Sequence, residues 1–272
     1  MANHWFLKDE HVEFRDSMTG IVREAAQDIC KDTTQGTLGD EHTQCQHLFS
    51  KMYTIMQQRQ EELSSALLCC SRIPDPVVEL RYYRSQVRRD RQAERPQFVE
   101  KETGADFALA LRVDLPEVLQ AERSVLGQGK RLSPPSADLN VGQLRDLLDA
   151  AGPESAVYLL WEIDFPPTVV SAENVSSHAR TKGKDRLYPD IAEFGQSLSD
   201  FFCESFLGLW FGRDYDPVKE GVRPPANSIP ILYHFLHRSV PPPNVVYLGI
   251  GSGKRMRVRP GVYVSRITEI GK

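Results

Sequence analysis

The sequence lacks the long apolar runs, leader segments and cysteine patterns that mark several classes of protein. No run approaches the roughly 18 apolar residues that a membrane-spanning helix needs, so we expect no contact with a membrane. The N-terminus, from Met1 to Trp5, shows no basic segment followed by an apolar run, so no signal peptide is expected. The five cysteines form no CxxC pair, which argues against a disulfide framework and a zinc ribbon. These absences predict a soluble protein of the reducing cytoplasm.

The sequence has no excess of positive charge either. The formal net charge is −4 and the pI is about 6.0, so any contact with nucleic acid must come from a local patch. A length of 272 residues allows one large domain or two small ones. No internal repeat or low-complexity linker divides the chain, and one domain with a C-terminal elaboration is the simplest organisation.

Several familiar enzyme motifs are also missing. The segments GQGKR from Gly127 and GIGSGKR from Gly249 resemble fragments of a phosphate-binding loop. In both segments an arginine stands where a serine or threonine should bind magnesium, which excludes nucleotide hydrolysis. No GxSxG motif supports a serine hydrolase. The histidines and cysteine of HTQCQH from His42 have no second pair of ligands, so they do not form a zinc pattern.

Apolar periodicity predicts alternating helices and strands. Helices are expected at 1–30, 45–70, 141–151 and 194–211, and a buried strand at 156–165. A polar loop is expected at 176–189, and a terminal β-hairpin is expected from 245–250 and 257–267. This order of elements predicts an α/β protein with a mixed sheet and helices packed against it.

A second predicted hairpin brings three polar side chains together. Its two apolar segments are 107–113 and 123–126. Folding the chain about Glu117 places Asp106 beside Gln128, because these two positions are equidistant from 117. Gln128 and Lys130 are two residues apart on a strand, so they project from the same face. A carboxylate, an amide and an ammonium group are therefore expected to meet at the open end of this hairpin.

These three groups are suited to phosphodiester hydrolysis. A carboxylate such as that of Asp106 can hold Mg²⁺, which prefers a few protein oxygens together with water and phosphate. A metal ion lowers the pKa of bound water and clamps the phosphate. Lys130 can orient the attacking water and offset the developing charge. The carbonyl oxygen of Gln128 could complete the metal shell where a second carboxylate usually stands.

This arrangement resembles the PD-(D/E)xK, or restriction-endonuclease-like, nuclease superfamily in its QxK variant. The resemblance rests on GAD ending at Asp106, on the hairpin, and on VLGQGKRL from Val125, followed by the helix and strand at 143–148 and 157–161. The upstream segment QEELSSALL resembles the family's helix that bears an acidic metal ligand. Aligning its leucine pair selects Glu61, with Glu62 as the second choice. The likeness extends to uncharacterised bacterial proteins and to nucleases of anti-phage systems.

The resemblance implies a fold and an activity. The expected fold is a restriction-endonuclease-like core at 45–165, with a mixed central β-sheet flanked by helices, an N-terminal helical extension at 1–44 and a C-terminal elaboration at 166–272. The expected activity is Mg²⁺-dependent cleavage of DNA, with Mn²⁺ as a possible substitute. Asp106, Glu61 and Gln128 would hold the metal, and Lys130 would position the water. The alternatives are a catalytically inactive nuclease-fold module that binds nucleic acid or protein, and a structural protein unrelated to nucleases.

A basic segment at 77–99 is the most evident candidate for binding DNA. Arginines bind phosphates through two hydrogen bonds and stack on bases or sugars. The residues expected to grip the DNA backbone are Arg81, Arg84, Arg88, Arg89 and Arg131. The alternative for such a charged run is a solvated helix or hairpin face. Because a complete nuclease would be toxic to its host, the resemblance also implies a regulatory partner protein or a homo-oligomeric switch.

Overall fold

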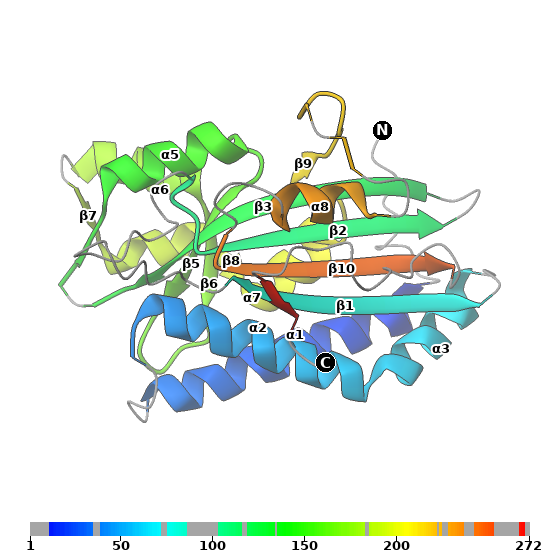
Figure 1. Cartoon of the computed structure of the whole chain (residues 1–272). Helices are drawn as coiled ribbons and strands as arrows, with labels where there is room; N and C mark the ends of the chain where they lie inside the picture. Colours follow the sequence, from blue (N-terminus) through cyan, green and yellow to red (C-terminus); the bar gives the residue numbers. More distant parts are fainter. Residues whose placement is uncertain are drawn as a thin grey trace.

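The computed structural model describes residues 11–34, 39–71, 75–85, 103–115, 119–133, 135–182, 185–221, 223–224, 228–236, 242–252 and 267–269. These residues form an α/β structure in which helices cover both faces of a mixed central sheet (Figure 1). The sequence-based expectation of this coarse class is confirmed. Within the described ranges, the structure contains no helix with the length and apolar character needed to span a membrane.

The central sheet has nine strands among the described residues. They are β1 (Pro76–Ser85), β2 (Phe107–Leu115), β3 (Leu119–Arg131), β5 (Ala156–Trp161), β6 (Thr168–Ser171), β8 (Gln196–Ser197), β9 (Arg213–Asp214), β10 (Asn244–Ser252) and β11 (Ile267–Glu269). The order across the sheet is β11-β1-β10-β2-β3-β5-β6-β8, and β9 pairs with β3 outside this path. A separate two-stranded sheet consists of β4 (Ala137–Asp138) and β7 (Arg186–Leu187).

The C-terminal third of the chain supplies an interior strand of this sheet. Strand β10 lies between β1 and β2, antiparallel to β1 and parallel to β2. The segment 166–272, expected as an elaboration packed on the core, therefore contributes one strand to the interior of the sheet. Of the second arm of the expected terminal hairpin, 257–267, all but Ile267 lies outside the described residues. The first arm, in β10, has β1 and β2 as its neighbours, and β11 pairs with the other side of β1.

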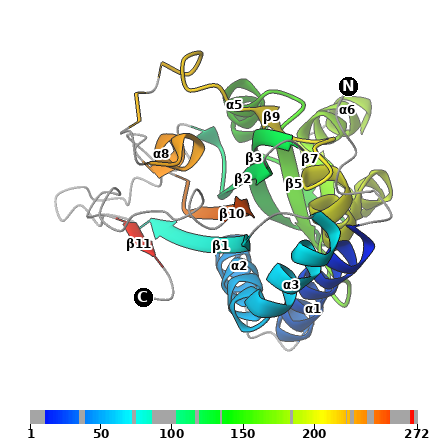
Figure 2. The ribbon, with the colours of Figure 1, turned by 90° about the vertical axis from the view of Figure 1, so that its right-hand side faces the viewer.

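Three N-terminal helices cover one face of the sheet (Figure 2). They are α1 (Val12–Thr34), α2 (Glu41–Gln58) and α3 (Gln60–Ser71). Helix α2 begins at Glu41 because the side chain of Asp40 caps it, accepting a hydrogen bond of 2.8 Å from the N–H of Thr43. The chain expected to form one helix over 45–70 is interrupted at Arg59 and forms the two helices α2 and α3. The expected boundary at 44 falls inside α2.

The opposite face of the sheet is covered by α5 (Val141–Ala151), α6 (Ala172–Lys182) and α8 (Pro230–Leu236). Helix α5 has the predicted bounds, because the Asn140 side chain caps its start and Gly152 ends it at a φ of +84°. Helix α6 replaces much of the loop expected at 176–189. The segment 194–211 contains only short helices, namely the end of the 3₁₀ helix Pro189–Phe194, α7 (Leu198–Asp200) and a π-helical turn (Phe201–Phe206).

Alternation along the strands divides the core into two layers. Phe107, Leu109 and Leu111 of β2 face the helices α1 to α3, whereas Ala108 and Ala110 face α5 and α8. The nearly continuous apolar sequence of β2 therefore reflects burial on both faces. Strands β2 and β3 form the expected hairpin at the centre of the molecule, with their open end beside the first turns of α2 and α5 (Figure 1).

Candidate functional site

The register of the β2–β3 hairpin places Asp106 beside Gln128. The pairs run from Leu115–Leu119 near the tip to Phe107–Gly127 near the open end, so the next pair outward is Asp106 with Gln128. The backbone N–H of Asp106 donates a hydrogen bond of 2.8 Å to the carbonyl oxygen of Gly127. The register predicted from folding about Glu117 is thus confirmed.

The carboxylate of Asp106 is held beside the backbone of β3. Asp106 is only 4% exposed, and its Oδ2 accepts a hydrogen bond of 2.8 Å from the N–H of Gly129. Gly104, two residues before Asp106, adopts a φ of +62°, which favours glycine. A Cβ at position 104 would also lie 2.3 Å from the carbonyl oxygen of Gln143 on α5. Glycine therefore allows the segment before Asp106 to lie directly against the first turn of α5.

Gln128 joins this carboxylate to α5. Its side chain is buried, and its Nε2 donates a hydrogen bond of 3.2 Å to Oε1 of Gln143. In the part of the chain that the structure describes, Oε1 of Gln128 is buried and accepts no hydrogen bond. A buried carbonyl oxygen without a donor is energetically costly, and such a group calls for a specific explanation. A cation is one ligand that could satisfy it.

Lys130 contacts an acid that the sequence reasoning did not select. Its Nζ lies 3.6 Å from Oε1 of Glu41, the first residue of α2. The same oxygen accepts a hydrogen bond of 3.3 Å from the backbone N–H of Arg131. Helix α2 can approach β3 this closely because Gly129 has no side chain, since a Cβ there would lie 2.8 Å from Sγ of Cys45. Glu41 and Lys130 are both about one-third exposed or less, so the contact is partly shielded from water.

The charge of Asp106 acts in a poorly hydrated region. Burial raises the pKa of the Cys45 thiol well above its ordinary value, and the negative charges of Asp106 and Glu41 raise it further. Burial likewise raises the pKa of Tyr158, with a further contribution from Asp106. Cys45 therefore remains a neutral thiol, which excludes it as a nucleophile or thiolate ligand near neutral pH.

The structure does not bring Glu61 to this site, which corrects the sequence-based assignment. Glu61 lies in the first turn of α3, beyond the end of α2 that is opposite to Glu41. Because α2 has 18 residues and a helix rises about 1.5 Å per residue, its two ends are about 25 Å apart, and Glu61 follows the end that is remote from Glu41. Both Glu61 and Glu62 are exposed, and Glu62 accepts a hydrogen bond from Ser17 of α1. Figure 1 shows α3 at the opposite end of the sheet from the hairpin's open end.

The proposed DNA-contacting arginines differ in their surroundings. Arg84 is exposed and pairs in register with Asn244, which pairs with Phe107, so Arg84 lies at the same end of the sheet as Asp106. Arg81 is half-buried and donates to Oε1 of Glu79 at 2.7 Å, which occupies its guanidinium group. Arg131 is half-buried at the end of β3. Arg88 and Arg89 lie outside the described residues.

The donor groups at the hairpin end fit a hard divalent cation, although no acidic cluster forms there. Among the described residues, no group of three histidine, cysteine or acidic side chains is arranged to hold a metal ion. Asp106, Gln128 and Glu41 together offer two carboxylates and a buried amide carbonyl with no hydrogen-bond donor. Oxygen donors of this kind suit Mg²⁺, which needs only one or two protein carboxylates besides water and phosphate.

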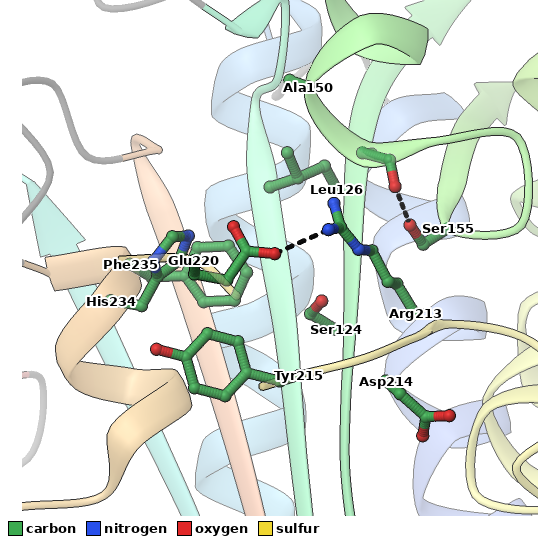
Figure 3. A pocket seen from close by; sticks show the side chains of 11 residues that line it. Ser124, Leu126, Ala150, Ser155, Arg213, Asp214, Tyr215, Glu220, His234 and Phe235 are labelled. Atoms are coloured by element: carbon green, nitrogen blue, oxygen red, sulfur yellow. Dashed lines mark hydrogen bonds and ion pairs between the residues drawn. The ribbon is translucent and has the colours of Figure 1, made fainter. Parts of the chain in front are cut away.

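Two cavities among the described residues lie away from the hairpin's open end. One cavity of about 20 Å³ lies between β3, α8 and the loop after β9, and Figure 3 shows the Arg213 guanidinium facing the Glu220 carboxylate there. This cavity has room for about one water molecule, so it is too small for a substrate. A larger groove of about 450 Å³ lies between α5 and α6. Neither cavity is lined by Asp106, Gln128 or Lys130.

Sequence reasoning missed Glu41 and Gln143. A signal for Glu41 was present, because Gly39-Asp40-Glu41 combines a helix-capping aspartate with an acid in the first turn. Gln143 stands three residues after the capping residue Asn140, but nothing in the sequence placed it opposite Gln128. Comparison of the chain with models of known families, with curated proteins and with solved structures found no match.

Proposed function

We propose that this chain is a Mg²⁺-dependent endonuclease that hydrolyses phosphodiester bonds of DNA, built on a restriction-endonuclease-like core of the QxK type. The observation that carries the proposal is the contact between Oδ2 of Asp106 and the N–H of Gly129. It fixes a buried carboxylate next to the two residues that flank Gly129, which are Gln128 and Lys130. A carboxylate, an amide oxygen and an ammonium group in this order match the chemistry needed at a scissile phosphate.

Within this proposal, Asp106, Gln128 and Glu41 hold Mg²⁺, for which Mn²⁺ substitutes. When bound, the ion would lower the pKa of a coordinated water molecule and neutralise negative charge on the phosphate. Lys130 orients the attacking water and offsets the charge that develops on the phosphate. Glu41 takes the part that the resemblance assigned to Glu61, because its carboxylate already lies 3.6 Å from the Lys130 ammonium group.

The proposal extends to the substrate and the setting. Arg84 and Arg131 lie at the site's end of the sheet and would contact the DNA backbone on two sides of Asp106. By resemblance, the enzyme belongs to bacterial anti-phage defence in the cytoplasm, where thiols remain reduced. The described cysteines Cys30, Cys45, Cys69 and Cys203 are all free. A regulatory partner protein or a homo-oligomeric switch restrains the activity.

Cleavage of supercoiled plasmid tests this proposal. The wild-type protein is expected to nick or linearise the plasmid with Mg²⁺ and to stop when EDTA is added. Lys130→Ala and Asp106→Ala should each lower the rate by about a hundredfold or more. Lys182→Ala, a change of an exposed lysine on α6, is the control and should keep the wild-type rate. Equal rates for all four proteins would reject the enzyme proposal.

A catalytically inactive nuclease-fold module is the second candidate. The polar side chains of the site already contact one another, because Lys130 pairs with Glu41 and Gln128 donates a hydrogen bond to Gln143. Such contacts favour a structural role for these groups over a catalytic one. Such a module should bind DNA or a partner protein equally well with and without EDTA. Its DNA affinity should also be unchanged by Asp106→Asn. The enzyme should instead bind DNA more tightly with the metal ion than without it, and Asp106→Asn should remove this difference.

A further inference from the structure

A buried asparagine links the C-terminal strand to the backbone of Asp106. Asn244 is the first residue of β10 and is fully buried. Its Nδ2 donates a hydrogen bond of 3.0 Å to the carbonyl oxygen of Asp106, and its Oδ1 accepts one of 2.6 Å from the hydroxyl of Tyr82 on β1. One side chain thus connects three adjacent strands at the level of the candidate site.

The sequence before β10 explains why a side chain makes this connection. Asn244 pairs with Phe107 in the parallel ladder between β10 and β2, and the residues before it are three prolines, 241–243. Proline has no N–H, so these residues cannot extend the ladder by donating to β2. The amide of Asn244 supplies the donor that the carbonyl of Asp106 needs at this buried position.

The connection is sealed from water on the side of α2. The ring of Phe49 lies 5.1 Å from the ring of Phe107 and 6.5 Å from the ring of Tyr82, measured between centroids. Tyr82 is 2% exposed, and burial raises the pKa of its hydroxyl, so it stays a protonated donor. Hydrogen bonds in such a dry environment are stronger, and leaving one partner unpaired is costly. The position of Asn244 is therefore well determined by Tyr82.

We propose that Asn244, supported by Tyr82, is a positioning residue that fixes the backbone of Asp106 so that its carboxylate stays against Gly129, between Gln128 and Lys130. The C-terminal third of the chain then completes the site without contributing a group to the chemistry. The catalytic meaning of this inference rests on the proposed function, but the positioning itself does not. The hydrogen bond from the N–H of Gly129 to Oδ2 of Asp106 reports whether the carboxylate is in place.

Amide hydrogen exchange followed by NMR tests the positioning directly. Asn244→Leu keeps the approximate size of the side chain but removes both hydrogen bonds. The exchange of the Gly129 N–H should become about tenfold faster. The N–H of Leu126, which is also on β3 but donates to the carbonyl oxygen of Ser155, should exchange at nearly the wild-type rate. Tyr82→Phe removes only the outer bond and should give a smaller acceleration in the same direction, which keeps the test valid if Asn244→Leu does not fold.

A matched control separates positioning from general destabilisation. Ser155→Ala removes another buried hydrogen bond from a side chain to a backbone carbonyl, that of Ser155 before β5 to Ala151 at the end of α5, and it leaves both hydrogen bonds of Asn244 in place. It should lower the melting temperature without selectively accelerating Gly129. Equal acceleration of Gly129 and Leu126 in Asn244→Leu, or an unchanged Gly129, would overturn the proposal.

The link to the site's chemistry is measured separately. Asn244→Asp keeps the acceptor for Tyr82 but loses the donor to Asp106, and it should weaken Mn²⁺ binding about tenfold, as loss of an orienting group beyond the ligands does. If wild-type protein binds no Mn²⁺ while Gly129 exchange responds as expected, the proposed function fails and the positioning stands. If Mn²⁺ binds and neither readout responds to Asn244, the positioning fails alone.

Discussion

The ammonium group of Lys130 lies 3.6 Å from the carboxylate of Glu41, which joins the end of β3 to the first residue of α2. Eighty-nine positions of sequence separate these two residues (130 minus 41). The contact changes which acid belongs to the candidate site. It also makes the start of α2 part of that site, because any change that frays this helix moves Glu41.

The first prediction distinguishes Glu41 from Glu61. Glu41→Gln should lower the rate of plasmid cleavage by about tenfold or more, because it removes a carboxylate from the proposed metal shell. Glu61→Gln should leave the rate unchanged, because Glu61 is exposed in the first turn of α3, beyond the end of α2 that is opposite to Glu41. Both substitutions remove one negative charge from a first helical turn, so each serves as the control for the other. Loss of activity with Glu61→Gln alone would contradict the assignment.

The second prediction concerns the space at Gly129. Gly129→Ala should destabilise the protein by about 1–3 kcal/mol, because its Cβ would lie 2.8 Å from Sγ of Cys45. The double change with Cys45→Ala should recover part of this loss, since the clashing atom is then absent. Chemical denaturation of the single and double variants measures this coupling. Gly20→Ala in α1 meets nothing within 4 Å and should instead stabilise by about 0.5–1 kcal/mol.

The part of the site that the sequence predicts is the part set by local geometry. Asp106 and Gln128 meet because a hairpin pairs residues symmetrically about its turn, and this arithmetic needs no knowledge of the rest of the fold. The sequence predicts helix α5 to its last residue because its leucines repeat at helical spacing and Gly152-Pro153 ends it. The coarse α/β class follows from the same local patterns.

The remaining features depend on contacts between distant segments. The apolar sequence of β10 is compatible with an edge strand, with one arm of a hairpin and with an interior strand of a sheet. Only tertiary packing selects its position between β1 and β2. The leucine pair that follows Glu61 was the reason to select this acid. Both the leucines and Glu61 lie on α3, after the interruption at Arg59, and therefore not on the helix that packs beside Lys130. Glu41 was missed because its partner Lys130 is brought close only by the packing of α2 on β3.

The third prediction concerns the cap of α2 and its dependence on pH. Hydrogen bonds from Thr43 hold the pKa of Asp40 below its ordinary value. Because the folded pKa is lowered, the stabilisation is fully present above the ordinary pKa and is lost as the pH falls through the folded value. Asp40→Ala should therefore cost about 0.5–2 kcal/mol near neutral pH, as loss of an N-cap does.

Urea denaturation at several pH values checks this prediction. The difference in unfolding free energy between wild type and Asp40→Ala should shrink as the pH falls from the ordinary pKa of an aspartate through the lower folded pKa of Asp40. Asp149→Ala is the control, because Asp149 is an exposed acid late in α5 with no capping position. A difference for Asp40→Ala that is constant down to the acid limit would refute the role of its charge.

The fourth prediction concerns DNA binding at Arg84. Arg84→Ala should weaken binding of duplex DNA irrespective of its sequence and reduce the slope of log K against log salt by about 1. The reason is that, in the proposed complex, this exposed arginine at the site's end of the sheet would contact phosphate rather than bases. Fluorescence anisotropy at several salt concentrations measures both effects. Lys31→Ala, which removes an exposed charge at the end of α1, should change neither quantity.

The most direct test of the account is a Mn²⁺ titration of the wild-type protein and of Asp106→Asn. Asparagine has nearly the shape of aspartate and can still accept the hydrogen bond from Gly129, so the fold should be kept while the charge is lost. The account predicts a Mn²⁺ site in the wild type whose affinity falls by about tenfold or more in Asp106→Asn. Equal affinities in the two proteins, or no binding to the wild type, would contradict the claim that the open end of the hairpin is a metal site.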